Sequence, residues 1–375
     1  MQRMEFNHTN ADGNYATHGY FRYFGKLPPA VIRFLIKRGA DGPNSGPIVD
    51  IMCGCGTSLV ESMLLGHASI GIDINPIATL VSKVKTTPID GRALADGLHQ
   101  LSDDEVSVSD HTLASLIPKF RNLDYWYLPE VQFELARLKC AIELIEDKRL
   151  RDFFMVAFLA ILRRASNSSP TPGRLFHIDH DKAPEVKRMF VEKATMMIKK
   201  MSELRWLAKS NDVQILCEDA RQTSLPDDLA AFVIFHPPYF ALYKYSSDVL
   251  RFELEWYGAD RRAIAASEIE DGFKTTDISR YERYTDDLVA VLAEAGRILK
   301  PGNRVCLVVN NSTFRDERLP VVADVCRKAS RGITTLAVEE VLERGVRFQQ
   351  ASYHRSARED KVTSQDYLVF FQKQS

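Results

Sequence analysis

The chain has 375 residues, of which 45% are hydrophobic and 26% charged, and its formal net charge at pH 7 is −1. These values are typical of a globular protein with a large core and, from its length, two or three domain-sized units. They exclude an overall basic field, so any contact with nucleic acid would need a local basic face.

The six cysteines are scattered along the chain, which favours reduced thiols over a disulfide framework. Cys53 and Cys55 lie too close in sequence for an ordinary disulfide and have no further ligand at zinc spacing. The N-terminal stretch lacks the apolar region of a signal peptide, and no apolar run has the length of a membrane span. We therefore expect a cytoplasmic protein that neither enters a membrane nor holds a metal.

The first part of the chain alternates strand and helix signals. Residues 47–52 and 68–73 are apolar runs that predict strands. The helix between them follows a glycine-rich turn, and Thr57 is expected to cap it and Gly66 to end it. Pro76 is expected in the first turn of the next helix. This βαβα order predicts a parallel sheet.

Residues 91–210 hold few strand-like runs and several stretches with apolar residues at helical spacing, so we interpret them as a helical insertion. The polar stretch 166–174 is expected to be a loop. The helices predicted most clearly in the insertion cover residues 131–145, 149–164 and 184–207.

The strand–helix alternation resumes at about residue 212 and includes a polar excursion over residues 243–281. The segment 366–373 is expected to form an edge strand. The other predicted elements are strands at 213–217, 231–235, 304–309 and 334–341 and helices at 285–299 and 319–328.

The glycine-rich turn and its acidic neighbours indicate a cofactor site. Gly54 and Gly56, at a strand-to-helix turn, allow a ligand to approach the backbone and the free N–H groups of a helix N-terminus. Asp73, at the end of the next strand, can accept both hydroxyls of a ribose. Asp50 suits a cofactor with a cationic amino-acid end, and S-adenosylmethionine has all of these groups. The alternative is a plain glycine turn without a ligand.

The apolar run 231–235 stops at a Pro-Pro pair, in the segment His236-Pro237-Pro238-Tyr239. The prolines fix two φ angles, so a backbone carbonyl, the His236 side chain and the Tyr239 ring are held at the carboxyl end of a strand. Ligands bind at this edge of an open α/β sheet. A fixed acceptor beside an aromatic face suits a flat ring with an amino group, such as a nucleobase.

These motifs resemble those of the amino-group DNA methyltransferases, which modify N6 of adenine or N4 of cytosine, also in restriction-modification systems. In that family an Asp, Asn or Ser precedes Pro-Pro and an aromatic residue. Residues 236–239 have the same order, with His in the first position. Residues 50–86 are similar to the family's cofactor motif and residues 18–29 to its N-terminal motif. Residues 218–221 are similar to its acidic turn at the adenine, and residues 352–355 with the strand after them to its C-terminal end.

The resemblance implies an α/β fold of class I, which is the Rossmann-like, mostly parallel sheet of S-adenosylmethionine-dependent methyltransferases. The catalytic domain would comprise residues 1–90 and 211–375. Residues 91–210 would be the helical insertion and a candidate target-recognition region, together with the polar excursion.

The resemblance also implies roles for single residues. The Pro237 carbonyl and His236 would accept the hydrogens of the target amine and free its lone pair, while Tyr239 stacks on the flipped base. This chemistry depends on positioning and needs no metal. The implied cofactor-binding residues are Tyr23, Lys26, Pro28, Asp50, Cys53, Gly54, Gly56, Thr57, Asp73, Ile74, Asp219 and Ala220.

Position 236 departs from the family pattern because it is His. A neutral imidazole can accept one hydrogen bond, whereas the protonated ring only donates. Activity that depends on neutral His236 is thus expected to fall as the pH drops through about 6.5, if the pKa is unperturbed. Three interpretations stay open: an active variant, a changed substrate, and a non-catalytic protein that keeps the cofactor pocket.

The function predicted from the sequence is S-adenosylmethionine-dependent methylation of an exocyclic amine in DNA. RNA, a protein amide or a small amine is the alternative substrate. The choice between adenine and cytosine, the recognition sequence and the formation of a homodimer are left open.

Basic residues of the insertion and of the catalytic domain are candidates for contact with a phosphate backbone. They are Arg163, Arg164, Arg174, Lys182, Lys187 and Arg188 in the insertion, and Arg261, Arg262, Arg280, Arg283, Arg347, Arg355 and Arg358 in the catalytic domain. Paired charges on a helix are more often only a solvated face. His177 and His180, which have acidic neighbours, are interpreted as loop residues rather than metal ligands.

Overall fold

The structure, a computed structural model, describes residues 2–6, 13–103, 108–169, 175–178, 182–240, 245–269, 277–314, 317–346 and 364–374. No helix in these ranges combines the length and apolar character that crossing a bilayer requires. The segment 352–355, which resembles the C-terminal end of the methyltransferase family, lies outside the described residues.

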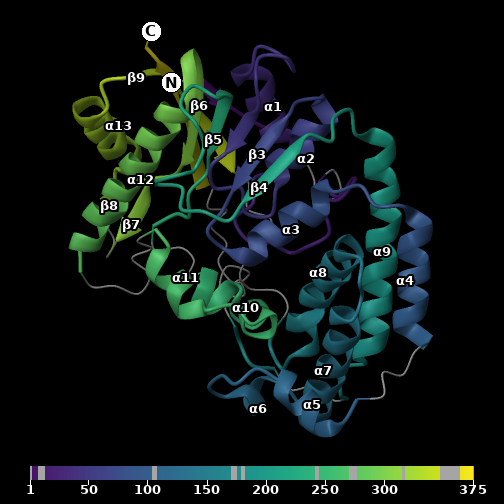
Figure 1. Ribbon diagram of the computed structural model, residues 1–375. Helices are drawn as coiled ribbons and strands as arrows, with labels where there is room; N and C mark the ends of the chain where they lie inside the picture. The colour runs from purple at the N-terminus through teal and green to yellow at the C-terminus, as the bar shows by residue number, and fades with distance from the viewer. Residues whose placement is uncertain are drawn as a thin grey trace.

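An eight-stranded sheet with the order β1-β9-β10-β6-β5-β2-β3-β4 forms one side of the molecule (Figure 1). The pairs from β4 to β6 are parallel, and β10 runs antiparallel to both of its neighbours, β9 and β6. The strands are β1 (Gln2–Met4), β2 (Ile48–Asp50), β3 (Ser69–Ile72), β4 (Val213–Leu216), β5 (Ala230–Phe235), β6 (Leu299–Val309), β9 (Leu336–Val346) and β10 (Ser364–Lys373). This mostly parallel, doubly wound sheet with one reversed strand confirms the predicted class I methyltransferase fold.

Side chains of successive strand residues alternate between two hydrophobic cores. Val49 and Val233 pack on the face that α12 (Ser279–Ile298) and α13 (Val321–Gly332) cover. Ile48 and Phe232 belong to the opposite core with α1 (Pro29–Gly39). Helices on both faces explain why the strands are apolar throughout, as is usual in parallel sheets.

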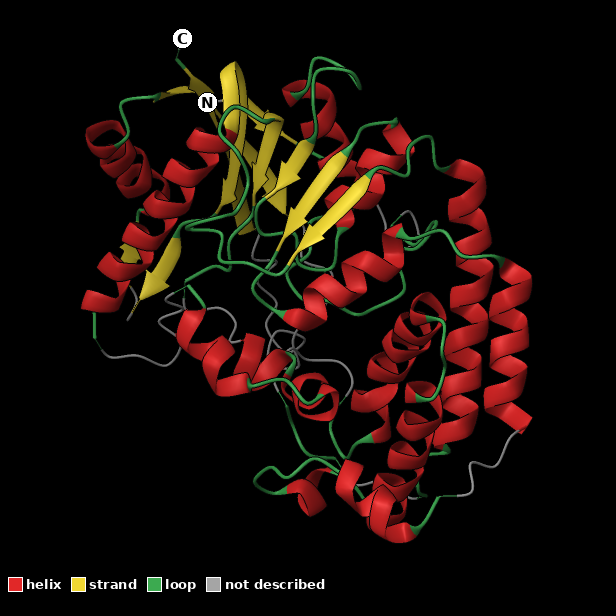
Figure 2. Ribbon diagram, in the orientation of Figure 1, coloured by secondary structure: helices red, strands yellow, loops and turns green. Residues whose placement is uncertain are grey.

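The segment between β3 and β4 is helical in its described parts, and its helices stand together beside the sheet (Figure 2). Tyr20, Val60 and Met63 share one hydrophobic core with Phe153 and Met197 of this segment. The division into a catalytic domain and an insertion therefore stays a prediction. Besides α1, the described helices that precede β4 are α2 (Thr57–Leu65), α3 (Pro76–Thr86), α4 (Gly91–Asp103), α5 (Asp110–Leu116), α6 (Leu123–Trp126), α7 (Pro129–Glu143), α8 (Lys148–Ala165) and α9 (Val186–Leu207).

The prediction of an edge strand at residues 366–373 is wrong. β10 pairs with β6 on one side and with β9 on the other. Its residues Tyr367 to Phe371 are all buried, as expected for a strand that packs on both faces. An interior place in the sheet thus explains the continuous apolar run better than an edge does.

Several short elements were not expected from the sequence. The strand β1 extends the sheet beside β9, and β7 (Ser312–Phe314) pairs with β8 (Glu317–Leu319). The polar excursion contains a π-helical turn over Tyr245–Val249, then α10 (Arg251–Tyr257) and α11 (Arg261–Ser267). These segments are short and lack a long apolar period, so the sequence pattern alone did not indicate them.

Candidate active site

A cavity opens at the carboxyl ends of β2, β3 and β5, and Asp50, Asp73 and His236 all line it. β2 and β5 are neighbours, although the chain passes through β3 and β4 between them. The strand order therefore reverses at this point, and open α/β sheets bind ligands where this occurs.

The glycine-rich turn adopts a backbone that only glycine allows easily. Gly54 and Gly56 have φ values of +50° and +70°. A Cβ atom on Gly56 would lie 2.7 Å from the Ser82 hydroxyl, and one on Gly54 would lie 3.1 Å from the Tyr23 ring. Both glycines thus permit the close packing of this turn.

The prediction that Thr57 caps α2 is wrong, because Gly56 is the N-cap residue and Thr57 is already helical. No cap side chain accepts a hydrogen bond from the backbone N–H groups in the first turn of α2. Thr57 instead lines the cavity. The end of the helix at Gly66, which has φ +91°, is as predicted.

Asp50 is buried at the carboxyl end of β2. Its carboxylate accepts hydrogen bonds from the Ser58 hydroxyl and, at 3.2 Å, from the Met52 N–H. Burial nevertheless raises the pKa of Asp50 to about 7, and the charge of Asp73 acts in the same direction. A cation at this carboxylate would relieve the cost of its ionisation.

Asp73 follows β3 and accepts the backbone N–H groups of Gly54 and Asn75, both at 2.9 Å. Burial raises the pKa of Asp73 to about 6, against the effect of these two hydrogen bonds. Asn75 caps α3 through its side-chain oxygen, while its buried Nδ2 has no partner among the described residues. The cavity thus contains an unsatisfied donor beside an acceptor.

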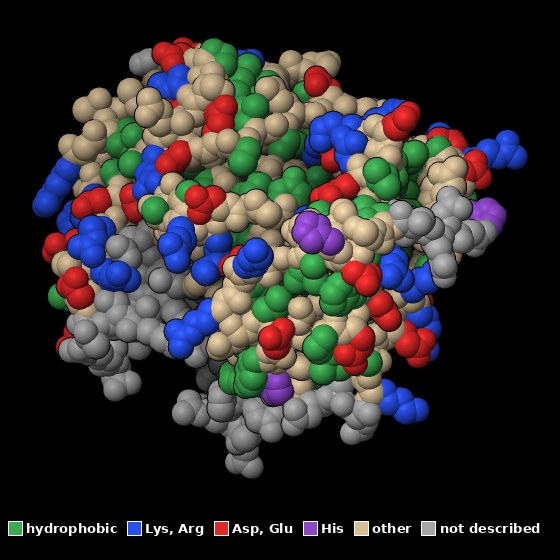
Figure 3. Space-filling view, turned by 60° about the horizontal axis from the view of Figure 1, so that its bottom comes forward, with side chains coloured by type: hydrophobic (Ala, Val, Ile, Leu, Met, Phe, Trp, Pro, Cys, Tyr) green, Lys and Arg blue, Asp and Glu red, His purple; other side chains and the backbone are tan. Residues whose placement is uncertain are grey.

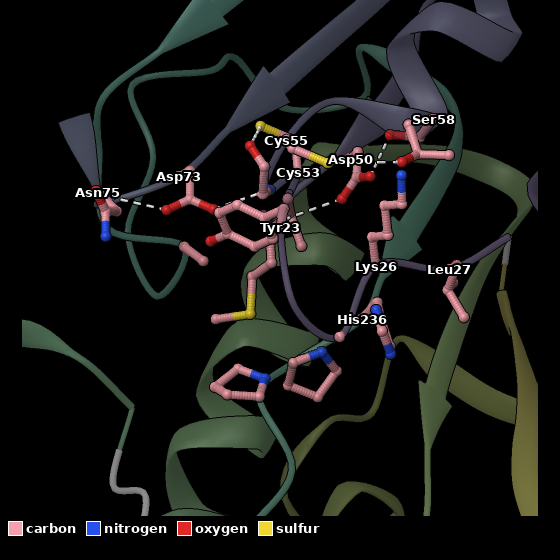
Figure 4. Close-up of a pocket in the computed structure, with 18 of the residues that line it drawn as sticks. Tyr23, Lys26, Leu27, Asp50, Cys53, Cys55, Ser58, Asp73, Asn75 and His236 are labelled. Atoms are coloured by element: carbon pink, nitrogen blue, oxygen red, sulfur yellow. Dashed lines mark hydrogen bonds between the residues drawn. The ribbon is translucent and has the colours of Figure 1, made fainter. Parts of the chain in front are cut away.

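Two tyrosine rings form one wall of the cavity. Tyr23 and Tyr245 are stacked, with ring centroids 5.4 Å apart. In the view of Figure 4 the Tyr23 ring appears between Asp73 and Asp50, and all three residues line the cavity.

The His236-to-Tyr239 segment leaves β5 beside this wall, and all of its residues line the same cavity. The Tyr284 hydroxyl donates to the Pro238 carbonyl at 2.9 Å and holds the segment to α12. No hydrogen bond among the described residues uses the Pro237 carbonyl. This carbonyl keeps its acceptor capacity for another group.

His236 is neutral over the whole physiological range. Burial lowers the pKa of His236 to about 3, and the charge of Arg344 contributes to this shift. The expected loss of activity through pH 6.5 is therefore corrected, since the imidazole stays an acceptor far below that pH.

Asp219 was expected near the adenine of a cofactor, but its carboxylate does not line the cavity. Both of its oxygens accept hydrogen bonds from Arg221, the shortest at 2.7 Å, and Arg221 also bonds Asp287. The neighbouring Ala220 does line the cavity. Only Ala220 of this pair remains in place for a ligand contact.

The sequence of this chain is similar to those of two type II methyltransferases. It is 32% identical to M.MvaI of Kocuria varians over 198 residues, which are 49% of this chain and 43% of M.MvaI. It is 35% identical to the type II methyltransferase M.MjaII of Methanocaldococcus jannaschii over 121 residues, 29% of this chain and 22% of that protein. About half of this chain is therefore homologous to part of a type II methyltransferase.

The homology covers less than half of each relative, and no family model matches the chain. Among solved structures, TrmN of Thermus thermophilus can be aligned with this chain at 12% identity and a TM-score of 0.38. The alignment covers 93% of this chain and 50% of TrmN. The structure of a DNA modification methylase of T. thermophilus with S-adenosyl-L-methionine aligns with 42% of the chain and 51% of that protein, at 19% identity and a TM-score of 0.27. Because both TM-scores are low, the assignment of the fold class rests on the order and direction of the strands in the sheet.

The cavity collects all but three of the catalytic and cofactor-binding residues that were predicted from the sequence. The exceptions are Pro28, which is the N-cap of α1, Gly56 and Asp219. The cavity residues are Tyr23, Lys26, Asp50, Cys53, Gly54, Thr57, Asp73, Ile74, Ala220, His236, Pro237 and Tyr239.

Several polar residues of the cavity were missed, namely Ser58, Asn75, Tyr245 and Glu268. Asn75 precedes Pro76, and an Asn before a Pro is a recognisable helix start that could have indicated its place. Glu268 bonds the backbone and hydroxyl of Ser246 at 3.0 and 2.9 Å, a contact between distant positions that no local pattern indicates.

Proposed function

We propose that this chain is an S-adenosylmethionine-dependent methyltransferase that modifies the exocyclic amine of adenine or cytosine in DNA. The observation that carries the proposal is that the His236-to-Tyr239 segment and the acidic glycine-rich turn open into one cavity. A methyl donor and a planar amine would therefore meet there. Homology to type II methyltransferases supports the same activity.

The residues of the cavity fit S-adenosylmethionine. Asp50 would pair with the ammonium group, which would offset the cost of ionising this buried carboxyl, whose pKa burial raises to about 7. Asp73 would accept the ribose hydroxyls, and the unsatisfied Nδ2 of Asn75 can donate to the same part of the ligand. Ala220 would contact the adenine. When bound, S-adenosylmethionine supplies an electrophilic methyl group.

The chain's own residues would position and activate the target amine. The Pro237 carbonyl and neutral His236 accept the two amine hydrogens, which frees the nitrogen lone pair for attack on the methyl carbon. Tyr239 offers a ring face to the flipped base, and Tyr284 fixes the segment through the Pro238 carbonyl. As the bond between the amine nitrogen and the methyl carbon forms, the bond between that carbon and sulfur would break. The methylated nitrogen would then lose one proton to solvent, because His236, with a pKa of about 3, accepts a hydrogen bond but is too weak a base to keep the proton.

A DNA partner is supported by basic groups between the N-terminal loop and the helices beside the sheet. Lys193 is held at the Gly19 carbonyl, and burial lowers its pKa to about 8, with the charges of Arg164 and Lys26 contributing. Such a group of neighbouring cations suits phosphates. Figure 3 shows basic and acidic side chains intermingled on the face it presents, in keeping with the net charge of −1. We propose further that the protein acts in the cytoplasm.

Other basic candidates are engaged with acidic side chains. Arg188 pairs with Glu185 and Glu192, and Arg261 pairs with Glu255 at 2.9 Å. These pairs favour a solvated face for α9 and α11. The phosphate contacts are thus proposed for the group around Lys193.

The test is expression of the chain in a host without related modification, followed by long-read sequencing of the host DNA. The expected result is N6-methyladenine or N4-methylcytosine in one short sequence context, absent with the Asp73→Ala variant. In parallel, the purified protein is incubated with S-adenosylmethionine carrying a labelled methyl group and with DNA, RNA or protein. Label in RNA or protein alone would replace DNA as the substrate. Cofactor binding without any transfer would indicate a non-catalytic protein.

A further inference from the structure

Arg221 lies in the turn after β4 and joins three separate segments beside the cavity. Its guanidinium group donates to both carboxylate oxygens of Asp219, at 3.0 Å from Nε and 2.7 Å from Nη2. Nη1 donates to Asp287 on α12 at 2.9 Å, and Nη2 also donates to the Ser267 carbonyl at 2.8 Å. This one side chain therefore fastens the end of α11 and the middle of α12 to the turn that carries Ala220.

Two features make these contacts more than a surface ion pair. The side chains of Arg221 and Asp287 are only 28% and 23% exposed, and a planar guanidinium group fits several acceptors at fixed angles. The last carbonyls of a helix also have no partner within it, and Arg221 provides one to α11, which has only seven residues. Its contacts therefore fix where α11 ends.

The residue after Ser267 continues the connection into the cavity. The Glu268 carboxylate accepts hydrogen bonds from the N–H of Ser246 at 3.0 Å and from its hydroxyl at 2.9 Å. Ser246 follows Tyr245, whose hydroxyl donates to the Phe24 carbonyl at 2.8 Å. Since Glu268 and Tyr245 both line the cavity, the end of α11 and this part of the cavity wall are bound to each other.

The Tyr245 ring lies on the cofactor side of the cavity. It stacks on Tyr23, and the Tyr23 ring packs against Gly54 of the glycine-rich turn. Gly25 has a φ of +75°, and a Cβ atom there would lie 2.7 Å from the Tyr245 hydroxyl, so the close approach needs glycine. A shift of Tyr245 would therefore disturb the wall beside the proposed methyl donor.

We propose that Arg221 is a positioning residue: by fastening the end of α11, it holds Tyr245 in the wall of the cofactor cavity. Arg221 is not among the described residues that line the cavity, so it acts through Glu268 and the segment that Glu268 binds. The effect on S-adenosylmethionine rests on the proposed function, whereas the fastening of α11 does not. The same contacts give the Asp219 carboxylate a role outside the cavity, as a partner of this arginine.

The first test is amide hydrogen exchange of the full chain without any ligand. Arg221→Lys keeps the positive charge but loses the planar fork, so amides within residues 245–269 should exchange at least about tenfold faster. Mass spectrometry of peptides from this range measures the rates. Unchanged exchange in residues 245–269 would overturn the proposal.

Arg297→Lys is the matched control, because Arg297 makes the same kind of fork further along α12. It donates to Glu294, to Asp227 and, at 2.8 Å, to the Leu225 carbonyl, and none of these described residues lines the cavity. Its variant should leave exchange in residues 245–269 unchanged. An equal increase in both variants would mean that the effect is a general loosening and would overturn the proposal.

The second test is a double-mutant cycle on the affinity for S-adenosylmethionine, measured by calorimetric titration. Arg221→Lys and Tyr245→Phe, which loses the bond to the Phe24 carbonyl, should each raise Kd by about tenfold. The double variant should bind about as weakly as the weaker single variant, because both changes release the same ring. Effects that multiply in the double variant would contradict the connection between Arg221 and Tyr245.

The two proposals fail separately. If the unsubstituted chain does not bind S-adenosylmethionine, the proposed function and the role of Arg221 toward this cofactor are both wrong, while hydrogen exchange still decides whether Arg221 fastens α11. Thermal unfolding of each variant excludes loss of the fold as the cause of faster exchange. Asp287→Asn, which weakens one bond to Arg221, provides the same test if Arg221→Lys does not fold.

Discussion

The carboxyl group of Asp50 is a buried acid with a pKa of about 7 in a cavity proposed for a cationic ligand. Binding of the ammonium group requires the ionised form. Below pH 7 the free protein must first release a proton, so affinity for S-adenosylmethionine is expected to fall about tenfold for each pH unit. Calorimetric titration between pH 5.5 and 8.5 measures this dependence.

The matched variant is Asp50→Asn, which keeps the shape of the side chain and cannot ionise. Its affinity should be low at all of these pH values and should vary less between them, with Asp73 as the remaining acid. Because the pKa of His236 is about 3, kcat at saturating cofactor is expected to stay flat down to pH 5.5. A slope in kcat, rather than in cofactor affinity, would contradict this assignment of the titrating group.

His236 tests the catalytic role at a single position. His236→Ala removes the acceptor and is expected to lower kcat by at least about 100-fold. Cofactor affinity should be nearly unchanged, because Asp50, Asp73 and Asn75 supply the polar contacts expected there. Radiolabelled methyl transfer and cofactor titration measure the two effects.

His236→Asn serves as the control, since its amide oxygen keeps a hydrogen-bond acceptor at this position. It should recover part of the activity that alanine loses. Loss of cofactor binding in His236→Ala would show instead that the residue belongs to the cofactor side of the cavity.

At the scale of elements, the glycine-rich turn sets how closely α2 and α3 approach. In Gly56→Ala, the new methyl group would meet the Ser82 hydroxyl in a left-handed backbone conformation. The expected destabilisation is about 2–4 kcal/mol. Chemical denaturation monitored by circular dichroism measures the free energy of unfolding.

Gly332→Ala is the corresponding control at the end of α13. Nothing lies within 4 Å of the added Cβ, and its φ is not positive. Its stability should be unchanged or slightly higher, because alanine favours the helix. Equal stability of the two variants would mean that the turn at Gly56 can relax.

The sequence predicted those elements whose signals are local. The βαβα unit and the Pro-Pro stop are short patterns of apolar residues, glycines and prolines, and both lie where predicted. The position of β10 between β6 and β9 depends on pairing between distant segments, so its apolar run alone was read as an edge. The resemblance implied a ligand contact for Asp219, but Arg221, two residues further on, donates hydrogen bonds to its carboxylate. The sequence does not indicate that pairing.

Part of the candidate site could also be predicted from the sequence. Residues next to a strand end, such as Asp50 and Asp73, are recognisable because strand ends of a parallel sheet meet at one edge. Arg344 and Asp366 pair with each other only in the folded sheet, and no spacing in the sequence indicates that ion pair.

At the scale of the whole molecule, one hydrophobic core joins the sheet's own helices to the helical segment at residues 91–210. Phe153 of α8 lies with its ring 6.0 Å from that of Tyr20, and the Tyr20 hydroxyl donates to the Met197 carbonyl at 2.7 Å. The whole chain is therefore expected to unfold in a single transition. Far-ultraviolet circular dichroism and tryptophan fluorescence should give coincident curves.

In Phe153→Ala, the cavity left in this shared core should destabilise the whole molecule by about 3–5 kcal/mol and keep the single transition. Trp126 and Trp256 lie in the shared core, so fluorescence reports on that region. Two separate transitions would instead support the division into a catalytic domain and an independently folding insertion.

Because β10 lies between β6 and β9, the sheet can be completed only late in synthesis. All other strands of the sheet leave the ribosome earlier, and β9 can join β6 only through β10. A nascent chain that has already delivered Asp50, Asp73 and His236 therefore still lacks the strand that joins β9 to β6, and every described residue that lines the cavity is synthesised before the sheet can be completed.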